Sequence, residues 1–133
     1  MPLYICNSAP GAIPSDAKAK IADDITSAHC DVTDAPARFV HTAFFENHQR
    51  FPLEGKSAFV VGTIRAGRTD EQKSIITDRI KRSILNHAGI SMEDCDAYVA
   101  ETPASWIMEG GEIMPEPGEE AAWLKAHAEK STQ

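Results

Sequence analysis

The order of predicted secondary-structure elements repeats once along the chain, and this repeat limits the possible folds more than any other feature. A short apolar segment, Leu3 to Asn7, is followed by turn-forming residues and predicts a strand. Apolar residues then recur at helical spacing over about residues 16–30, with Ser15 as the expected N-cap. Arg38 to Glu46 is rich in β-branched and aromatic residues and predicts a second strand. These signals predict a β-α-β unit over about residues 2–46.

The same order of elements returns over about residues 57–101. The segments Ala58 to Ile64 and Asp96 to Glu101 have the composition of strands. Between them, Thr69 and Gln72 have the spacing of a capping box, and isoleucines at helical spacing follow. The sequence therefore predicts a second β-α-β unit in tandem with the first.

Two β-α-β units in tandem predict an α+β fold in two layers, in which a four-stranded mixed sheet carries two helices on one face. We expect a single domain over residues 1–133, with residues 102–133 as a C-terminal extension. In this extension, the glycine pair at 110–111 lies between apolar residues and predicts a small hairpin over Trp106 to Met114. A short helix is expected to begin after Pro117.

The face of the sheet opposite the helices is expected to hold many of the Phe, Val and Ile side chains, and few residues remain to cover it. Burial of apolar surface stabilises an assembly by about 25 cal/mol per Å². An uncovered apolar face therefore favours self-association, although this argument does not set the number of subunits.

Composition and charge exclude several classes of function. The chain has 13 Lys and Arg against 20 Asp and Glu, and a net charge of -7, which argues against binding to nucleic acid or to anionic lipid. No apolar stretch approaches the roughly 18–20 residues that span a membrane. The first residues lack the features of a signal peptide, so we expect a cytoplasmic protein. The 3 cysteines have no spacing typical of a disulfide framework or a zinc ribbon.

The start of the chain is the first candidate for chemistry. Initiator methionine is normally removed before a small residue, and removal of Met1 would leave Pro2 with a free secondary amine. An α-amino group has a reference pKa of about 7.7–8.0, and a prolyl nitrogen is somewhat more basic. Such a group can act as an acid or a base near neutral pH. A Met-Pro start is also common and without function in many proteins, so this pair alone leaves both interpretations open.

Two arginines, Arg65 and Arg68, lie between the third predicted strand and the capped helix, with Gly67 allowing a tight turn. Unpaired backbone N–H groups point outward where a strand leads into a helix, which favours an anion. Two guanidinium groups at this turn could hold a carboxylate through bidentate hydrogen bonds. The alternative is a solvated basic turn that pairs with acidic residues.

Three further residues are candidates with ordinary structural alternatives. His29 could donate a hydrogen bond to a bound carboxylate, or it could offset the dipole at the end of the first helix. Glu109 could be a general base or an exposed side chain, and Tyr98 has the position of a packing residue in a strand. A metal site would draw on residues whose spacing matches no common ligand pattern: His29, Cys30, His41 and His48.

These candidates occur together with flanking residues in one order along the chain. The segments are Met1-Pro2, Ala28-His29, Ile64 to Thr69, Tyr98 before Glu101-Thr102-Pro103, Met108-Glu109-Gly110, and Pro115 to Gly118. With the tandem β-α-β halves, this order resembles the tautomerase superfamily, and specifically its cis-3-chloroacrylic acid dehalogenase family, over about residues 2–124. The resemblance implies a tautomerase fold like that of MIF, a homotrimer, a small carboxylate substrate, and no cofactor or metal.

The resemblance also implies a role for each matching residue. Pro2, freed of Met1, is similar to the catalytic amino-terminal proline. Tyr98 and Glu109 correspond to the pair that positions and activates water. The residues that correspond to the binders of the substrate carboxylate are His29, Arg65 and Arg68.

Two activities and one non-catalytic role are compatible with these residues. The first is hydration of small unsaturated carboxylates, including 3-halo acids, with the proline as acid. The alternative is a keto-enol tautomerase acting on phenylpyruvate or a hydroxydienoate, with the proline as base. A binding protein that retains the fold without catalysis is the third. The chain departs from the dehalogenase pattern at positions that bear on the substrate: Gly110 replaces an aromatic residue, Glu112 an arginine and His41 a glutamine.

Overall fold

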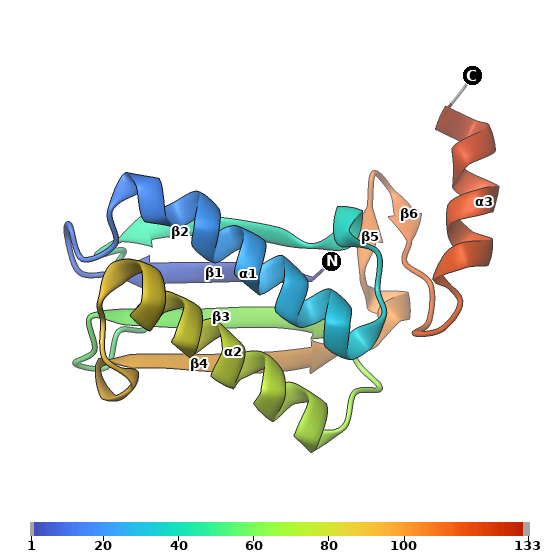
Figure 1. Ribbon diagram of the computed structural model, residues 1–133. Coiled ribbons are helices and arrows are strands. Elements are labelled where there is room, and N and C mark those ends of the chain that lie inside the picture. The colour runs from blue at the N-terminus through green and yellow to red at the C-terminus, as the bar shows by residue number, and fades with distance from the viewer. Residues whose placement is uncertain (1, 132–133) are drawn as a thin grey trace.

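The computed structural model describes residues 2–131, with side chains through Ala128, so the predicted removal of Met1 and the last two residues of the expected domain lie outside it. One mixed sheet has the strand order β2-β1-β3-β4 (Figure 1). Strand β1 pairs in parallel with β2 and antiparallel with β3, and β3 pairs in parallel with β4. The strands are β1 (Leu3–Ser8), β2 (His41–Glu46), β3 (Ala58–Arg65) and β4 (Cys95–Thr102). The predicted four-stranded mixed sheet is confirmed.

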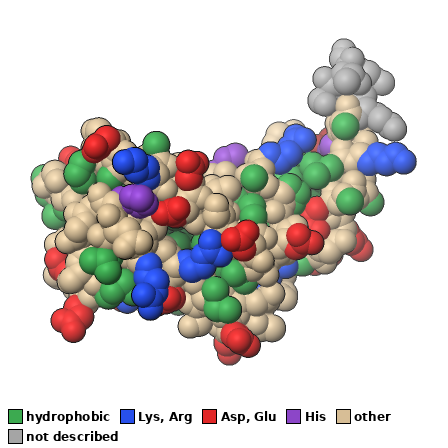
Figure 2. All heavy atoms as spheres, viewed as in Figure 1, with side chains coloured by type: hydrophobic (Ala, Val, Ile, Leu, Met, Phe, Trp, Pro, Cys, Tyr) green, Lys and Arg blue, Asp and Glu red, His purple; other side chains and the backbone are tan. Residues whose placement is uncertain are grey.

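Two long helices, α1 (Ser15–Thr33) and α2 (Asp70–Ala88), cover one face of this sheet, as predicted (Figure 1). Their isoleucines pack with sheet residues into the main core, which includes Ile21, Ile25, Ile76, Ile80 and Ile84. Full burial of such a side chain contributes about 1.5–3 kcal/mol. The outer surface of the helical layer carries charged side chains of both signs (Figure 2). Among the described residues, no helix is long and apolar enough to cross a membrane.

The helix starts differ in how they are capped. The predicted capping box of α2 is present, because the Thr69 hydroxyl accepts from the Gln72 N–H and the Gln72 side chain accepts from the Thr69 N–H. Helix α1, however, already begins at Ser15, and its N-cap is Pro14, which has no side-chain hydrogen bond. The prediction of Ser15 as the N-cap was therefore wrong by one residue.

The second strand is shorter than the sequence predicts. Residues Ala37–Phe39 form a 3-10 turn, and β2 begins only at His41. The reason is the extent of its partner, because β1 begins at Leu3, and Leu3 pairs with His41. Residues 38–40 therefore lose their strand pairing, and the Phe39 side chain becomes buried instead.

The C-terminal extension contains the predicted hairpin and short helix. The hairpin consists of β5 (Met108–Glu109) and β6 (Glu112–Ile113), and it is followed by α3 (Glu120–Ser131). These elements lie at the end of the sheet where β1 begins (Figure 1). They form a second small core with residues of the extension and the 3-10 turn: Phe39, Ile107, Met114, Trp123 and Leu124.

The sheet face away from the helices carries apolar side chains, as expected. The register places Ile5 beside Val61 and Val61 beside Tyr98, so their side chains share one face. In the single chain, Tyr98 is 61% exposed and Phe45 is also exposed. This face is the surface on which self-association was predicted.

Gly62 is required where Tyr4 crosses strand β3. A Cβ atom at this position would lie 2.6 Å from Cδ1 of Tyr4 and 3.0 Å from Cγ1 of Val99. Because the aromatic ring is fully buried and cannot move aside freely, Gly62→Ala should lower the free energy of unfolding by about 1–3 kcal/mol. Urea unfolding measures this change, with Thr63→Ser on the opposite face of the strand as the control. Equal stability of Gly62→Ala and the unaltered protein would contradict this packing.

Candidate active site

Antiparallel pairing of β1 with β3 brings the start of the chain to the end of β3. Leu3 pairs with Thr63, so the preceding residue, Pro2, lies one step closer to Arg65. Pro2 is fully buried, and its carbonyl oxygen accepts a hydrogen bond of 2.9 Å from the His41 N–H. The predicted catalytic proline and the first predicted arginine therefore lie at the same end of the sheet.

His29 lies near the end of α1 and is buried, with 2% exposure. Its Nδ1 lies 2.8 Å from the hydroxyl oxygen of Tyr4. Burial, and after it the positive charges of Arg68 and Arg65, lower the pKa of His29 to about 3. A neutral imidazole contributes no charge to the helix dipole, so the lowered pKa does not favour the alternative of a cation at the helix end.

The Tyr4 hydroxyl determines which hydrogen bonds His29 can make. Burial raises the pKa of Tyr4, so its phenol stays protonated and can donate to Nδ1 of His29. When Tyr4 donates to Nδ1, the neutral imidazole carries its proton on Nε2. In this tautomer the second ring nitrogen is a hydrogen-bond donor, which suits contact with a carboxylate without adding charge.

Arg65 is held by three groups around its guanidinium. Nη1 donates to the carbonyl oxygen of Pro115 at 2.6 Å, and Nη2 donates to Oε1 of Glu120 at 2.8 Å. The guanidinium carbon lies 5.6 Å from the centre of the Phe39 ring. With 2% exposure, Arg65 is therefore a buried cation whose charge is balanced by a carboxylate of the C-terminal extension.

Arg68 is bound much more loosely. Its Nη1 has one long hydrogen bond, 3.4 Å, to the carbonyl oxygen of Thr33. Its Nε is buried and has no hydrogen-bond partner among the described residues. Burial and the charge of Arg65 both lower the pKa of Arg68, although a guanidinium remains charged at neutral pH. Arg68 consequently has the greater capacity to accept an added anion.

The backbone of the Arg65–Arg68 turn does not provide the expected anion site. Gly67 has a positive φ of 114°, as a tight turn requires. However, the N–H groups of Gly67 and Arg68 both donate to Oε2 of Glu101, at 3.0 and 3.4 Å. The predicted backbone contribution is therefore wrong for this turn, and anion binding here depends on the arginine side chains.

Glu109 lies in the hairpin, and its Oε1 is 3.4 Å from Nε2 of His41. Both side chains line a cleft of about 470 Å³ that is completed by Arg38, Phe39, Gly110 and Trp123. Because the His41 N–H also bonds to Pro2, the cleft lies next to the chain start. The partly exposed carboxylate of Glu109 is therefore accessible to water in this cleft.

Of the predicted site residues, Tyr98 alone lies away from this end of the sheet in the described part of the single chain. It lies in the middle of the edge strand β4, opposite Val61, whereas Arg65 pairs with Thr102 at the end of that strand. Its groove is shared with residues of α2, including Asp70 and Lys73. The chain thus brings five predicted residues to one end of the sheet: Pro2, His29, Arg65, Arg68 and Glu109.

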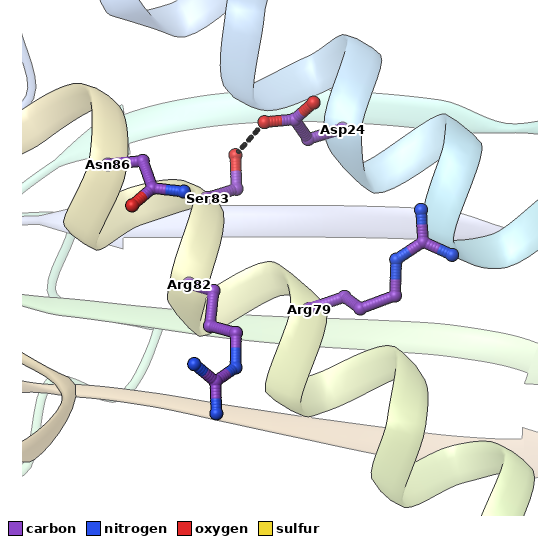
Figure 3. A pocket seen from close by; sticks show the side chains of 5 residues that line it. All are labelled: Asp24, Arg79, Arg82, Ser83 and Asn86. Atoms are coloured by element: carbon purple, nitrogen blue, oxygen red, sulfur yellow. Dashed lines mark hydrogen bonds between the residues drawn. The ribbon is translucent and has the colours of Figure 1, made fainter.

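A separate hollow between α1 and α2 contains no predicted site residue (Figure 3). Ser83 donates to Asp24 across it at 2.7 Å (Figure 3). Its arginines are paired with neighbouring carboxylates, Arg79 with Asp31 and Arg82 with Asp78. This hollow is a surface network of ion pairs. Among residues 2–131, no group of three or more His, Cys, Asp or Glu side chains could hold a metal.

Tyr4 and Glu120 are the residues of this region that sequence reasoning missed. Tyr4 could have been found, because a tyrosine on the helix-facing side of a strand is buried and needs a partner for its hydroxyl. Glu120 carries no comparable signal, since a glutamate in the first turn of a helix is ordinary at the surface.

The neutral state of His29 predicts a loss of stability in acid. The unfolded chain takes up a proton near the usual histidine pKa of 6.5, whereas the folded chain does so only at about pH 3. Because the unfolded state binds more protons between these values, His29 should lower the free energy of unfolding by about 1.4 kcal/mol per pH unit as the pH falls.

NMR measures this directly. The ring signals of His29 should not titrate between about pH 4.5 and pH 8 in the folded protein, and they should titrate normally in the urea-unfolded control. Titration of the folded residue with an ordinary histidine pKa would refute the buried neutral imidazole.

Comparison with known proteins places this arrangement in a family. Residues 1–128 match the family described as "Putative oxalocrotonate tautomerase enzyme". The solved structure of N1, a member of the cis-3-chloroacrylic acid dehalogenase (cis-CaaD) family, is similar with a TM-score of 0.81 and 28% identity, over 98% of this chain and 99% of that one. Ps01740 is 32% identical with a TM-score of 0.70, over 80% of this chain and 99% of that one.

A fused 4-OT protein, solved as a symmetric trimer, shares the fold with a TM-score of 0.71 and 18% identity, over 84% of this chain and 94% of that one. No curated protein sequence matches the chain. The family match over almost the full length and the strand and helix arrangement shared with N1 agree with the resemblance seen in the sequence. The chain therefore belongs to this oxalocrotonate tautomerase family, within the tautomerase superfamily.

Proposed function

We propose that the chain is a cofactor-independent enzyme that hydrates small unsaturated carboxylates, including cis-3-chloroacrylate, with Pro2 as the acid after removal of Met1. The observation that carries this proposal is the position of the chain start. Pro2 lies at the end of the sheet that also holds two buried or half-buried arginines, a neutral histidine and a carboxylate in a cleft. These groups match the requirements of acid-assisted addition of water to an anionic substrate.

The proposed reaction begins with capture of the substrate carboxylate by the arginines and the Nε2–H of His29. Charge-assisted hydrogen bonds draw electron density from the attached C=C bond and make C3 electron-poor. Glu109 takes a proton from water, the oxygen attacks C3, and the protonated Pro2 nitrogen delivers a proton to C2. With a chlorine on C3, the adduct loses chloride and a proton to give malonate semialdehyde.

The charge of Pro2 distinguishes hydration from the alternative activity. The nearby arginines lower the pKa of an amine, whereas a nearby Glu109 carboxylate raises it. A protonated proline can donate to C2, as hydration requires. A neutral proline can instead remove a proton, which makes a phenylpyruvate or hydroxydienoate tautomerase the second candidate function.

We also propose a homotrimer, in which a second copy of the chain supplies Tyr98 to the site. Tyr98 is 61% exposed on the apolar sheet face, away from the other site residues of its own chain. Burial of that face against another copy would cover the apolar side chains and remove Tyr98 from water. The solved symmetric trimer of a fused 4-OT protein supports this assembly through shared fold.

Glu109→Gln separates the two catalytic functions. The amide cannot take up a proton from water, so the rate of malonate semialdehyde formation from cis-3-chloroacrylate should fall by at least about 100-fold. Tautomerisation of phenylpyruvate requires no activated water and should not fall, because loss of the carboxylate lowers the pKa of Pro2 and favours its neutral form. A matched control is Glu119→Gln, an exposed residue outside the cleft.

The activity toward each substrate distinguishes the candidate functions. Normal hydration by Glu109→Gln would remove this residue from water activation. If the unaltered protein turns over phenylpyruvate but no unsaturated acid, the tautomerase is the correct function. If neither the unaltered protein nor Pro2→Ala turns over any of these acids, the remaining interpretation is a binding protein without catalysis.

A further inference from the structure

Glu120, the first residue of α3, is the only acidic side chain among the described residues that forms a salt bridge with Arg65. One carboxylate oxygen, Oε1, accepts from Arg65 Nη2 at 2.8 Å. The other, Oε2, accepts from the Gly118 N–H at 2.9 Å. Both oxygens are thus engaged, and the residue is 8% exposed, so this carboxylate is fixed in place.

The guanidinium of Arg65 depends on this carboxylate. A buried cation is strongly unfavourable unless an opposite charge and hydrogen bonds compensate for its lost hydration. Glu120 supplies the charge, the Pro115 carbonyl supplies a second acceptor, and the Phe39 ring lies against the guanidinium. Each terminal nitrogen of Arg65 therefore uses one N–H on the protein and retains another.

The two arginines of the turn therefore differ in the contacts that hold their guanidinium groups. Arg65 is held on three sides, whereas Arg68 has one long hydrogen bond and a buried Nε without a partner among the described residues. The charge of Arg68 is the one left to bind an anion, whereas the contacts of Arg65 fix the direction of its remaining N–H groups.

We propose that Glu120 is a positioning residue, which holds the Arg65 guanidinium in the orientation that a substrate carboxylate requires alongside Arg68. The identity of the ligand in this inference rests on the proposed function, whereas the contacts between Glu120 and Arg65 are observed in the chain itself. The same extension carries Glu109 in its hairpin. Glu120 therefore joins the carboxylate-binding end of the site to the segment that presents the proposed base.

Two other roles for Glu120 make different predictions. If Glu120 occupied Arg65 in place of the substrate carboxylate, its removal would strengthen binding of the substrate. If it served stability alone, its removal would change the unfolding midpoint without altering the affinity of the folded protein. Positioning predicts weaker binding, because an unpaired buried guanidinium turns toward water or other carboxylates.

The test compares Glu120→Gln with Glu119→Gln, its exposed neighbour. Calorimetry first measures binding of propionate, a saturated carboxylate that cannot be hydrated. Glu120→Gln should raise the Kd of propionate by about tenfold or more, and Glu119→Gln should leave it within about twofold. With cis-3-chloroacrylate, KM should rise in parallel while kcat stays within about threefold.

An unchanged or lower Kd for propionate in folded Glu120→Gln would overturn the proposal. Where this variant does not fold, Arg65→Lys retains the charge pair without the planar fork and should raise the same Kd; an unchanged value would also overturn it. Propionate binding is separate from turnover, so failure of the hydratase proposal leaves this test intact. Conversely, if the unaltered protein turns over the substrate and Glu120→Gln leaves the Kd of propionate unchanged, only the positioning proposal is contradicted.

Discussion

Antiparallel pairing between β1 and β3 is the constraint on which the candidate site depends. It places the residue before Leu3 next to the end of β3, where the chain turns through Arg65 and Arg68 into α2. Parallel pairing would have sent the chain start to the opposite end of the sheet. The chemistry proposed for Pro2 is therefore a consequence of strand direction, since no side chain has to carry the amine to the arginines.

The buried charge at this end of the sheet links the site to the C-terminal extension. Arg65 would be poorly tolerated with 2% exposure if α3 did not bring a carboxylate to it. The small core around Phe39 and Trp123 fixes α3, and the same core lines the cleft of Glu109. The hairpin and helix thus contribute both a lining of the cleft and the counter-charge of Arg65.

Local signals explain how much could be predicted from the sequence. The capping box at Thr69 and the helical spacing of isoleucines are short-range patterns, and the structure confirms the elements that they predict. The prediction of a strand at residues 38–40 was wrong because its partner, β1, begins only at Leu3, which composition does not reveal. In the site, the pairing of Arg65 with Glu120 joins residues far apart in sequence, and local patterns carry no information about such contacts.

The proposed chemistry requires a free prolyl nitrogen and a bound carboxylate that lie side by side. The most direct measurement is a pH titration of the Pro2 nitrogen by NMR, in protein labelled with ¹⁵N-proline, with and without propionate. We expect a signal that titrates as an amine and whose pKa rises when the anion binds, because a nearby negative charge favours the protonated form. A nitrogen that shows no titration, as in a peptide bond to Met1, or one whose titration is indifferent to propionate, would contradict it.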